Sequence, residues 1–199
     1  VTNGMDTFSS ASGLGQVSAV ICLLILIYAA FPIAHVVRTA GDSLSASKSN
    51  SVDFIARDFV VTNIKALGHI TALVALFGAI CSTVGWVLNS DGMSMSVDLI
   101  GAFAYAYALP LDAAATFLEM IRLGFVGGVL ETFNGWDLTG SEASGYNIAG
   151  LVAVGYEYAQ VILILAKLYL ALAIYHFFYG ILSTLTRWIQ RPSLPFKTS

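Results

Sequence analysis

The chain has 199 residues, of which 57% are hydrophobic and only 11% are charged. A soluble domain typically carries about 25% charged residues, so an ordinary soluble enzyme is a poor fit. The net charge of −3 and the two cysteines also argue against a nucleic-acid-binding surface and a disulfide-stapled secreted scaffold. With a mean hydropathy of +0.80, the chain is predicted to be an all-α, polytopic integral membrane protein, with residues 1–199 forming a single membrane domain.

Three stretches are long and apolar enough to cross a bilayer, which takes roughly 20 helical residues. We expect the first span at about 16–37 and the second at about 64–88, where Lys65 lies at the entry. A third apolar stretch, about 148–185, is longer than a bilayer is thick. Because Glu157 lies in its first part, we expect this helix to project beyond the bilayer, with the true span at about 161–185.

Residues 97–133 are apolar but interrupted by charged side chains. Pro110 is expected to start a helix, because proline suits the first helical turn. Downstream of it, polar residues recur at i, i+4, i+7 and i+10, a spacing that places them on one face of a helix. These residues are Asp112, Thr116, Glu119 and Arg122. The segment is therefore predicted to be an amphipathic helical region.

The basic residues mark one side of the membrane. Seven of the nine Lys and Arg residues flank or fill the first loop or follow the last span, whereas nine of the twelve acids lie in the N-terminal tail or within 91–157. The positive-inside rule places the first loop and the C-terminus in the cytoplasm and the N-terminus outside. An even number of crossings then separates the first loop from the C-terminus. We therefore expect three spans, with 97–133 at the outer interface or re-entering the bilayer; four spans are the alternative and violate the charge rule once.

Two histidines are candidates for binding a cofactor. His35 ends the first predicted span and His69 opens the second, so both are expected at similar depth in the cytoplasmic half. Such a pair is compatible with bis-histidine ligation of a b-type haem. The alternative is that each is an ordinary interfacial or hydrogen-bonded histidine. No histidine and carboxylate spacing typical of a di-metal site is present.

Ionisable groups also lie within the last predicted helix. Glu157 and Lys167 share one of its faces, and His176 lies on another. Charges within a span are costly and require partners, and we expect Lys167 to form an interhelical pair with Asp112, Glu119 or another protein. Cys22 and Cys81 lie toward the outer ends of their spans and could approach one another, most commonly as buried free thiols, with a disulfide as the alternative.

The sequence favours a non-enzymatic subunit that packs with other integral membrane subunits in a larger complex, without nucleic acid. No phosphate-binding loop or hydrolase motif is present. The alternatives are a haem b- or quinone-associated anchor of an electron-transfer complex and a component of an oligomeric transporter or channel. A bacterial inner membrane or an equivalent organellar membrane is the expected location. The predicted docking residues are Asp112, Glu119, Arg122, Glu157, Lys167 and His176.

Overall fold

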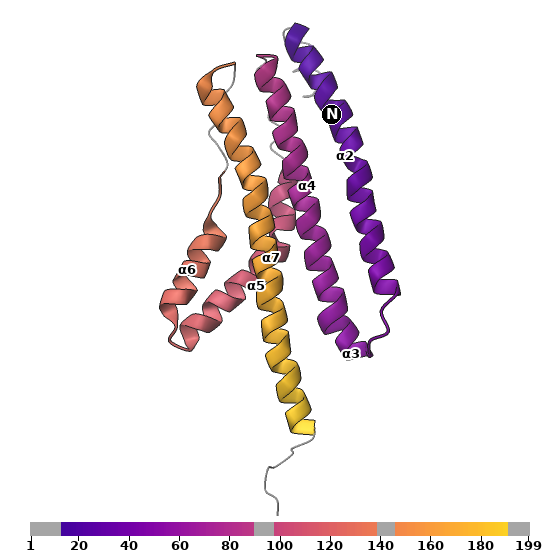
Figure 1. Cartoon of the computed structure of the whole chain (residues 1–199), viewed down its shortest axis with the longest axis vertical. Helices are drawn as coiled ribbons and strands as arrows, with labels where there is room; N and C mark the ends of the chain where they lie inside the picture. The colour runs from indigo at the N-terminus through magenta and orange to yellow at the C-terminus, as the bar shows by residue number, and fades with distance from the viewer. Residues whose placement is uncertain (1–12, 90–97, 139–145, 191–199) are drawn as a thin grey trace, which may run out of the picture.

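A computed structural model describes residues 13–89, 98–138 and 146–190, and for 98–103 and 190 it describes the helix alone. Within these ranges every regular element is helical. The three longest helices lie side by side (Figure 1): α2 (Gly13–Ser45), α4 (Val60–Val87) and α7 (Ile148–Gln190). α4 packs extensively against both α2 and α7.

The described residues are all-α, as predicted, and three helical stretches are long and apolar enough to cross a membrane. They cover Gly13–Ser45, Ser51–Val87 and Ile148–Ile189, so each is longer than the predicted span. The second is lengthened by α3 (Ser51–Asp53) and the π-helix η1 (Phe54–Phe59), which run directly into α4. The third is one continuous helix, in agreement with the long apolar run.

The two ends of this three-helix layer are fixed by contacts between distant residues. At one end, the Trp86 indole Nε1 donates to the Asn147 carbonyl oxygen at 3.0 Å, and its ring stacks on Tyr146. At the other end, the Tyr179 hydroxyl donates to an Asp53 carboxylate oxygen at 2.7 Å. The end of α4 therefore lies beside the start of α7. At the other end, α3 and η1 lie beside the second half of α7.

The segment predicted as one amphipathic region is a hairpin of two helices, α5 (Asp98–Met120) and α6 (Gly124–Gly135). The Phe117 ring packs edge-on against Phe178 of α7, with the ring centroids 5.1 Å apart. The turn between α5 and α6 accordingly lies at the same end of the molecule as α3 (Figure 1).

Two predictions for this segment are wrong. Pro110 lies inside α5 and does not start it, because the apolar run before the proline is itself helical and the fixed φ of proline is compatible with a helix. Arg122 does not continue the polar face of α5, because the helix ends at Met120 and Arg122 has a φ of 64° in the turn. The left-handed conformation there reverses the chain.

A close approach of backbones holds the hairpin together. A Cβ added at Gly127 of α6 would lie 2.9 Å from the backbone oxygen of Ala115 and 3.0 Å from the Glu119 Cγ. Real Cβ atoms essentially never come as close as the first distance, which is to backbone, so a larger residue would push α6 away from α5. The neighbouring Gly128 has open space around it.

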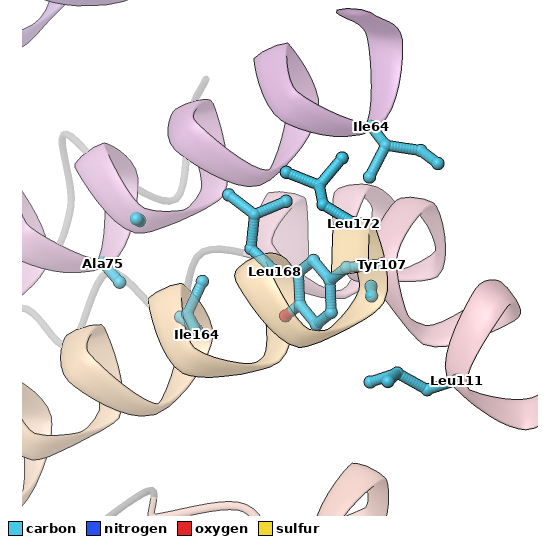
Figure 2. Packing of buried hydrophobic residues seen from close by; sticks show 9 residues of the cluster. Ile64, Ala75, Tyr107, Leu111, Ile164, Leu168 and Leu172 are labelled. Atoms are coloured by element: carbon cyan, nitrogen blue, oxygen red, sulfur yellow. The ribbon is translucent and has the colours of Figure 1, made fainter. Parts of the chain in front are cut away.

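The hydrophobic core lies where α4, α5 and α7 meet, and Figure 2 shows its side chains pointing toward one another. Leu111, Ile164 and Leu168 are at most 1% exposed. Gly68 lets Leu168 seat directly against the α4 backbone, since an added Cβ would lie 2.4 Å from a Leu168 methyl carbon. The core thus fixes the hairpin to one side of the α4–α7 pair. It leaves α2 outside.

Candidate functional site at the end of the hairpin

Lys167 lies in the middle of α7 and is 6% exposed. Its ammonium group donates hydrogen bonds to the backbone oxygens of Asn134 at 2.7 Å and Trp136 at 2.5 Å. Both acceptors belong to the C-terminal end of α6, where the last carbonyl groups of a helix lack intrahelical partners and carry the negative end of its dipole. The buried cation therefore caps α6 and fixes the hairpin to α7.

Other polar groups surround this contact. The Asn134 side-chain amide donates to an Asp112 carboxylate oxygen at 2.6 Å, which joins α6 to α5. Gln160, two turns before Lys167 on α7, accepts the backbone N–H of Leu138 at 2.9 Å. The Asp137 carboxylate lies close enough to Lys167 to interact with it electrostatically. Lys167, Asn134, Asp112, Gln160 and Asp137 form a polar cluster where three helices converge, which we call the Lys167 cluster.

The predicted pairing of Lys167 is only half right. The partner does come from the segment that follows the second span, but it is neither the Asp112 nor the Glu119 carboxylate. Two backbone carbonyl groups bind the ammonium directly, because the reversal after α5 brings the end of α6 to the level of Lys167. The cation is satisfied within the chain and does not itself call for a second protein.

The acids of the hairpin have a different environment. Asp112, Glu119 and Glu131 are exposed, and no described residue forms an ion pair with Glu119 or Glu131. The hairpin also exposes large apolar side chains, of which Met120 is 75% and Phe125 is 86% exposed. Over 98–137 the sequence carries five acids and one base, Arg122. We call the exposed side chains of Glu119, Glu131, Met120 and Phe125 together the hairpin face.

Glu157 and His176 lie away from the Lys167 cluster. The Glu157 carboxylate lies near the Ser82 hydroxyl of α4, so Glu157 and Lys167 face different helices although they share a face of α7. His176 is exposed, and its Nδ1 lies 2.7 Å from the Leu172 carbonyl oxygen within α7. No hydrogen bond or ion pair joins either residue to the hairpin among the described residues. Their predicted docking roles and the transport route through Glu157 stay predictions.

His35 and His69 lie at the same level of adjacent helices, as expected. The contacts of Cys22 with Cys81 and of Tyr28 with Phe77 set the register between α2 and α4, and this register carries on to His35 and His69. The His69 ring, however, packs against Tyr169 of α7, with the ring centroids 6.2 Å apart. Its Nδ1 lies 2.6 Å from the Lys65 carbonyl oxygen. Joint ligation of a haem iron would require His69 to leave Tyr169, and the haem hypothesis stays a prediction.

Sequence reasoning missed Asn134 and Asp137, because single polar residues at and just after the end of a helix form no recognisable spacing. Within the described residues no group of three His, Cys, Asp or Glu side chains is arranged to hold a metal ion. The Lys167 cluster is suited to holding two membrane segments together, and the hairpin face is suited to meeting a further surface. No family model, curated protein or solved structure matches this chain.

Proposed function

We propose that α2, the α3–η1–α4 helix and α7 cross the membrane, with the N-terminus outside and the C-terminus in the cytoplasm. The hairpin then enters from the outer side and turns back near the inner side. Two observations support this topology. The basic residues cluster beside the first loop and after α7, and the ring contact of Phe117 with Phe178 brings the hairpin turn to the level of the first loop. Because the hairpin enters and leaves on the same side, it adds no crossing. The three crossings keep the first loop and the C-terminus on the same side, as the positive-inside rule requires.

The hairpin face is the observation that carries the function. In a membrane, exposed carboxylates such as Glu119 and Glu131 are costly against lipid, and residues of this kind typically face protein or water. Exposed side chains such as Phe125 and Met120 are equally unsuited to a water-filled surface. A second protein that offers both hydrogen-bond donors and apolar groups satisfies the two requirements together.

The protein is, on this proposal, a non-enzymatic subunit of a larger complex in a bacterial inner membrane or an equivalent organellar membrane. Its long helices anchor it, and the Lys167 cluster holds the hairpin in place. The hairpin face binds another integral membrane subunit, which supplies basic groups opposite Glu119 and Glu131. The described residues lie almost entirely within helices, which fits a structural contribution.

A double variant, Glu119→Gln with Glu131→Gln, tests this function. These changes keep the size of both side chains and leave the bond between Asp112 and Asn134 intact. The tagged chain, purified from native membranes in a mild detergent, is expected to bring down one or more other integral membrane proteins. The double variant should recover them at least about tenfold less well, since losing one partner of a charge pair costs more than a tenfold change in affinity.

The matched control is Asp42→Asn, which removes an exposed carboxylate of α2 outside the hairpin. It should leave the recovery of partners unchanged. A wild-type chain that purifies as a monomer without partners would contradict the proposed function. Equal recovery by the double variant and the wild type would contradict the role of the hairpin face.

A further inference from the structure

Cys22 of α2 and Cys81 of α4 face one another across the contact between these helices. The Cys22 Sγ lies 3.7 Å from the Cys81 carbonyl oxygen, and the Cys81 Sγ lies 3.9 Å from the Cys22 carbonyl oxygen. The two thiols also interact with each other. Both cysteines are free and partly buried. They are the only cysteines of the chain, so no other disulfide can form within one chain.

Small residues bring the two backbones close together at this point. Ser18 lies one turn before Cys22 and is 4% exposed, and Gly85 lies one turn after Cys81 and is buried. A disulfide requires Cα atoms roughly 4.4–6.8 Å apart. Each sulfur already lies in contact distance of the main chain of the other residue, so the helices need little movement to meet this requirement.

We propose that Cys22 and Cys81 are a disulfide site oxidised by a lipid-soluble quinone. One S–S bond forms and two S–H bonds break. The two thiols lose two electrons and two protons, and the quinone takes up both and becomes a quinol. On the proposed topology, Cys22 lies about six residues inside the predicted span that begins at about 16, or about 9 Å from its outer end, within the apolar layer where membrane quinones dissolve.

The bond would act on the most loosely held of the long helices. Far less of α2 than of α4 or α7 is buried within the molecule, and its extensive packing is with α4 alone. A covalent link at Cys22 would therefore fasten α2 to α4, and reduction would leave α2 held by packing alone. This inference does not depend on the hairpin face.

The test uses the full chain in native membranes, reduced and then exposed to a short-chain benzoquinone. After denaturation, free thiols are counted by alkylation and linked peptides are identified by mass spectrometry. We expect both thiols to disappear together, with one linked pair of peptides two hydrogens lighter than its parts. The Cys22→Ser variant should keep Cys81 open to alkylation under the same treatment.

Several results would overturn the proposal. If both thiols stay alkylatable after the quinone, the pair is not oxidised by this class of oxidant. If copper phenanthroline links the pair while the quinone does not, the geometry is suitable but the proposed oxidant is wrong. If the linked product joins two chains, the pairing within one chain is wrong.

Discussion

Replacing Lys167 by methionine is expected to release the hairpin from α7 while α2, α4 and α7 stay folded. Methionine keeps the apolar stem but removes the ammonium, so the carbonyl groups of Asn134 and Trp136 lose their donor. A hydrogen bond to a charged group contributes roughly 1.5–3 kcal/mol. We expect the docking of α6 to weaken by about 2 kcal/mol, or roughly 30-fold in the equilibrium for local opening.

Hydrogen–deuterium exchange of the chain in detergent micelles or nanodiscs measures this effect. Amides of 124–138 should exchange about 30-fold faster in Lys167→Met than in the wild type, given the weakening expected above. Amides near the centres of α4 and α7 should change little. The control is Lys65→Met, which removes an exposed lysine from α4 and should leave the hairpin unaffected. Unchanged exchange over 124–138 in the Lys167→Met variant would show that the cation does not hold the hairpin.

Replacing Gly68 by alanine is expected to destabilise the whole core. The new methyl group would lie 2.4, 2.7 and 2.9 Å from three carbon atoms of the Leu168 side chain. Leu168 is 0% exposed, so its side chain can move aside only within a packed core. Overpacking of this kind costs roughly 1–3 kcal/mol, and here it opposes the contact between α4 and α7.

Thermal unfolding in one detergent, with Gly78→Ala as the control, separates the clash from other effects. Gly78 lies on the same helix and an added Cβ meets nothing within 4 Å. Both variants gain the same helix propensity of about 1 kcal/mol from alanine, so the difference between their midpoints reports the clash. Gly68→Ala should unfold at the lower temperature. An equal or higher midpoint for Gly68→Ala would mean that Leu168 can move aside freely.

The sequence was sufficient to predict the three long helices, because an uncharged apolar run of about 20 residues matches the thickness of a bilayer and suits few other environments. The length of α7 and the closeness of Cys22 to Cys81 followed from the same runs. The reversal at Arg122 was missed for a physical reason. The helical spacing of polar residues from Asp112 extends to Arg122, so the pattern predicts a helix through this point. The helix in fact ends at Met120, and Arg122 lies in the turn.

The partners of Lys167 were beyond prediction for another reason. Every residue has a backbone carbonyl group, so an acceptor such as the oxygen of Asn134 leaves no mark in the sequence. Only the fold decides which carbonyl groups lack partners at the end of a helix. The acids of the hairpin were recognised as misplaced charges, but the fold was needed to show that Glu119 and Glu131 are exposed on one helical hairpin.

The measurement that tests the account most directly is thiol labelling from the two sides of the membrane. In a chain with both native cysteines changed to serine, single cysteines are placed at Lys48 in the first loop, at Arg122 in the hairpin turn and at Ile148 at the start of α7. Arg122 and Ile148 are exposed, and Lys48 lies in the loop between α2 and α3. A membrane-impermeant maleimide should reach Lys48→Cys and Arg122→Cys from the cytoplasmic side and Ile148→Cys from the outer side. Labelling of Arg122→Cys from the outer side would show that the hairpin does not enter the membrane, and would contradict the proposal that its acidic face meets another subunit there.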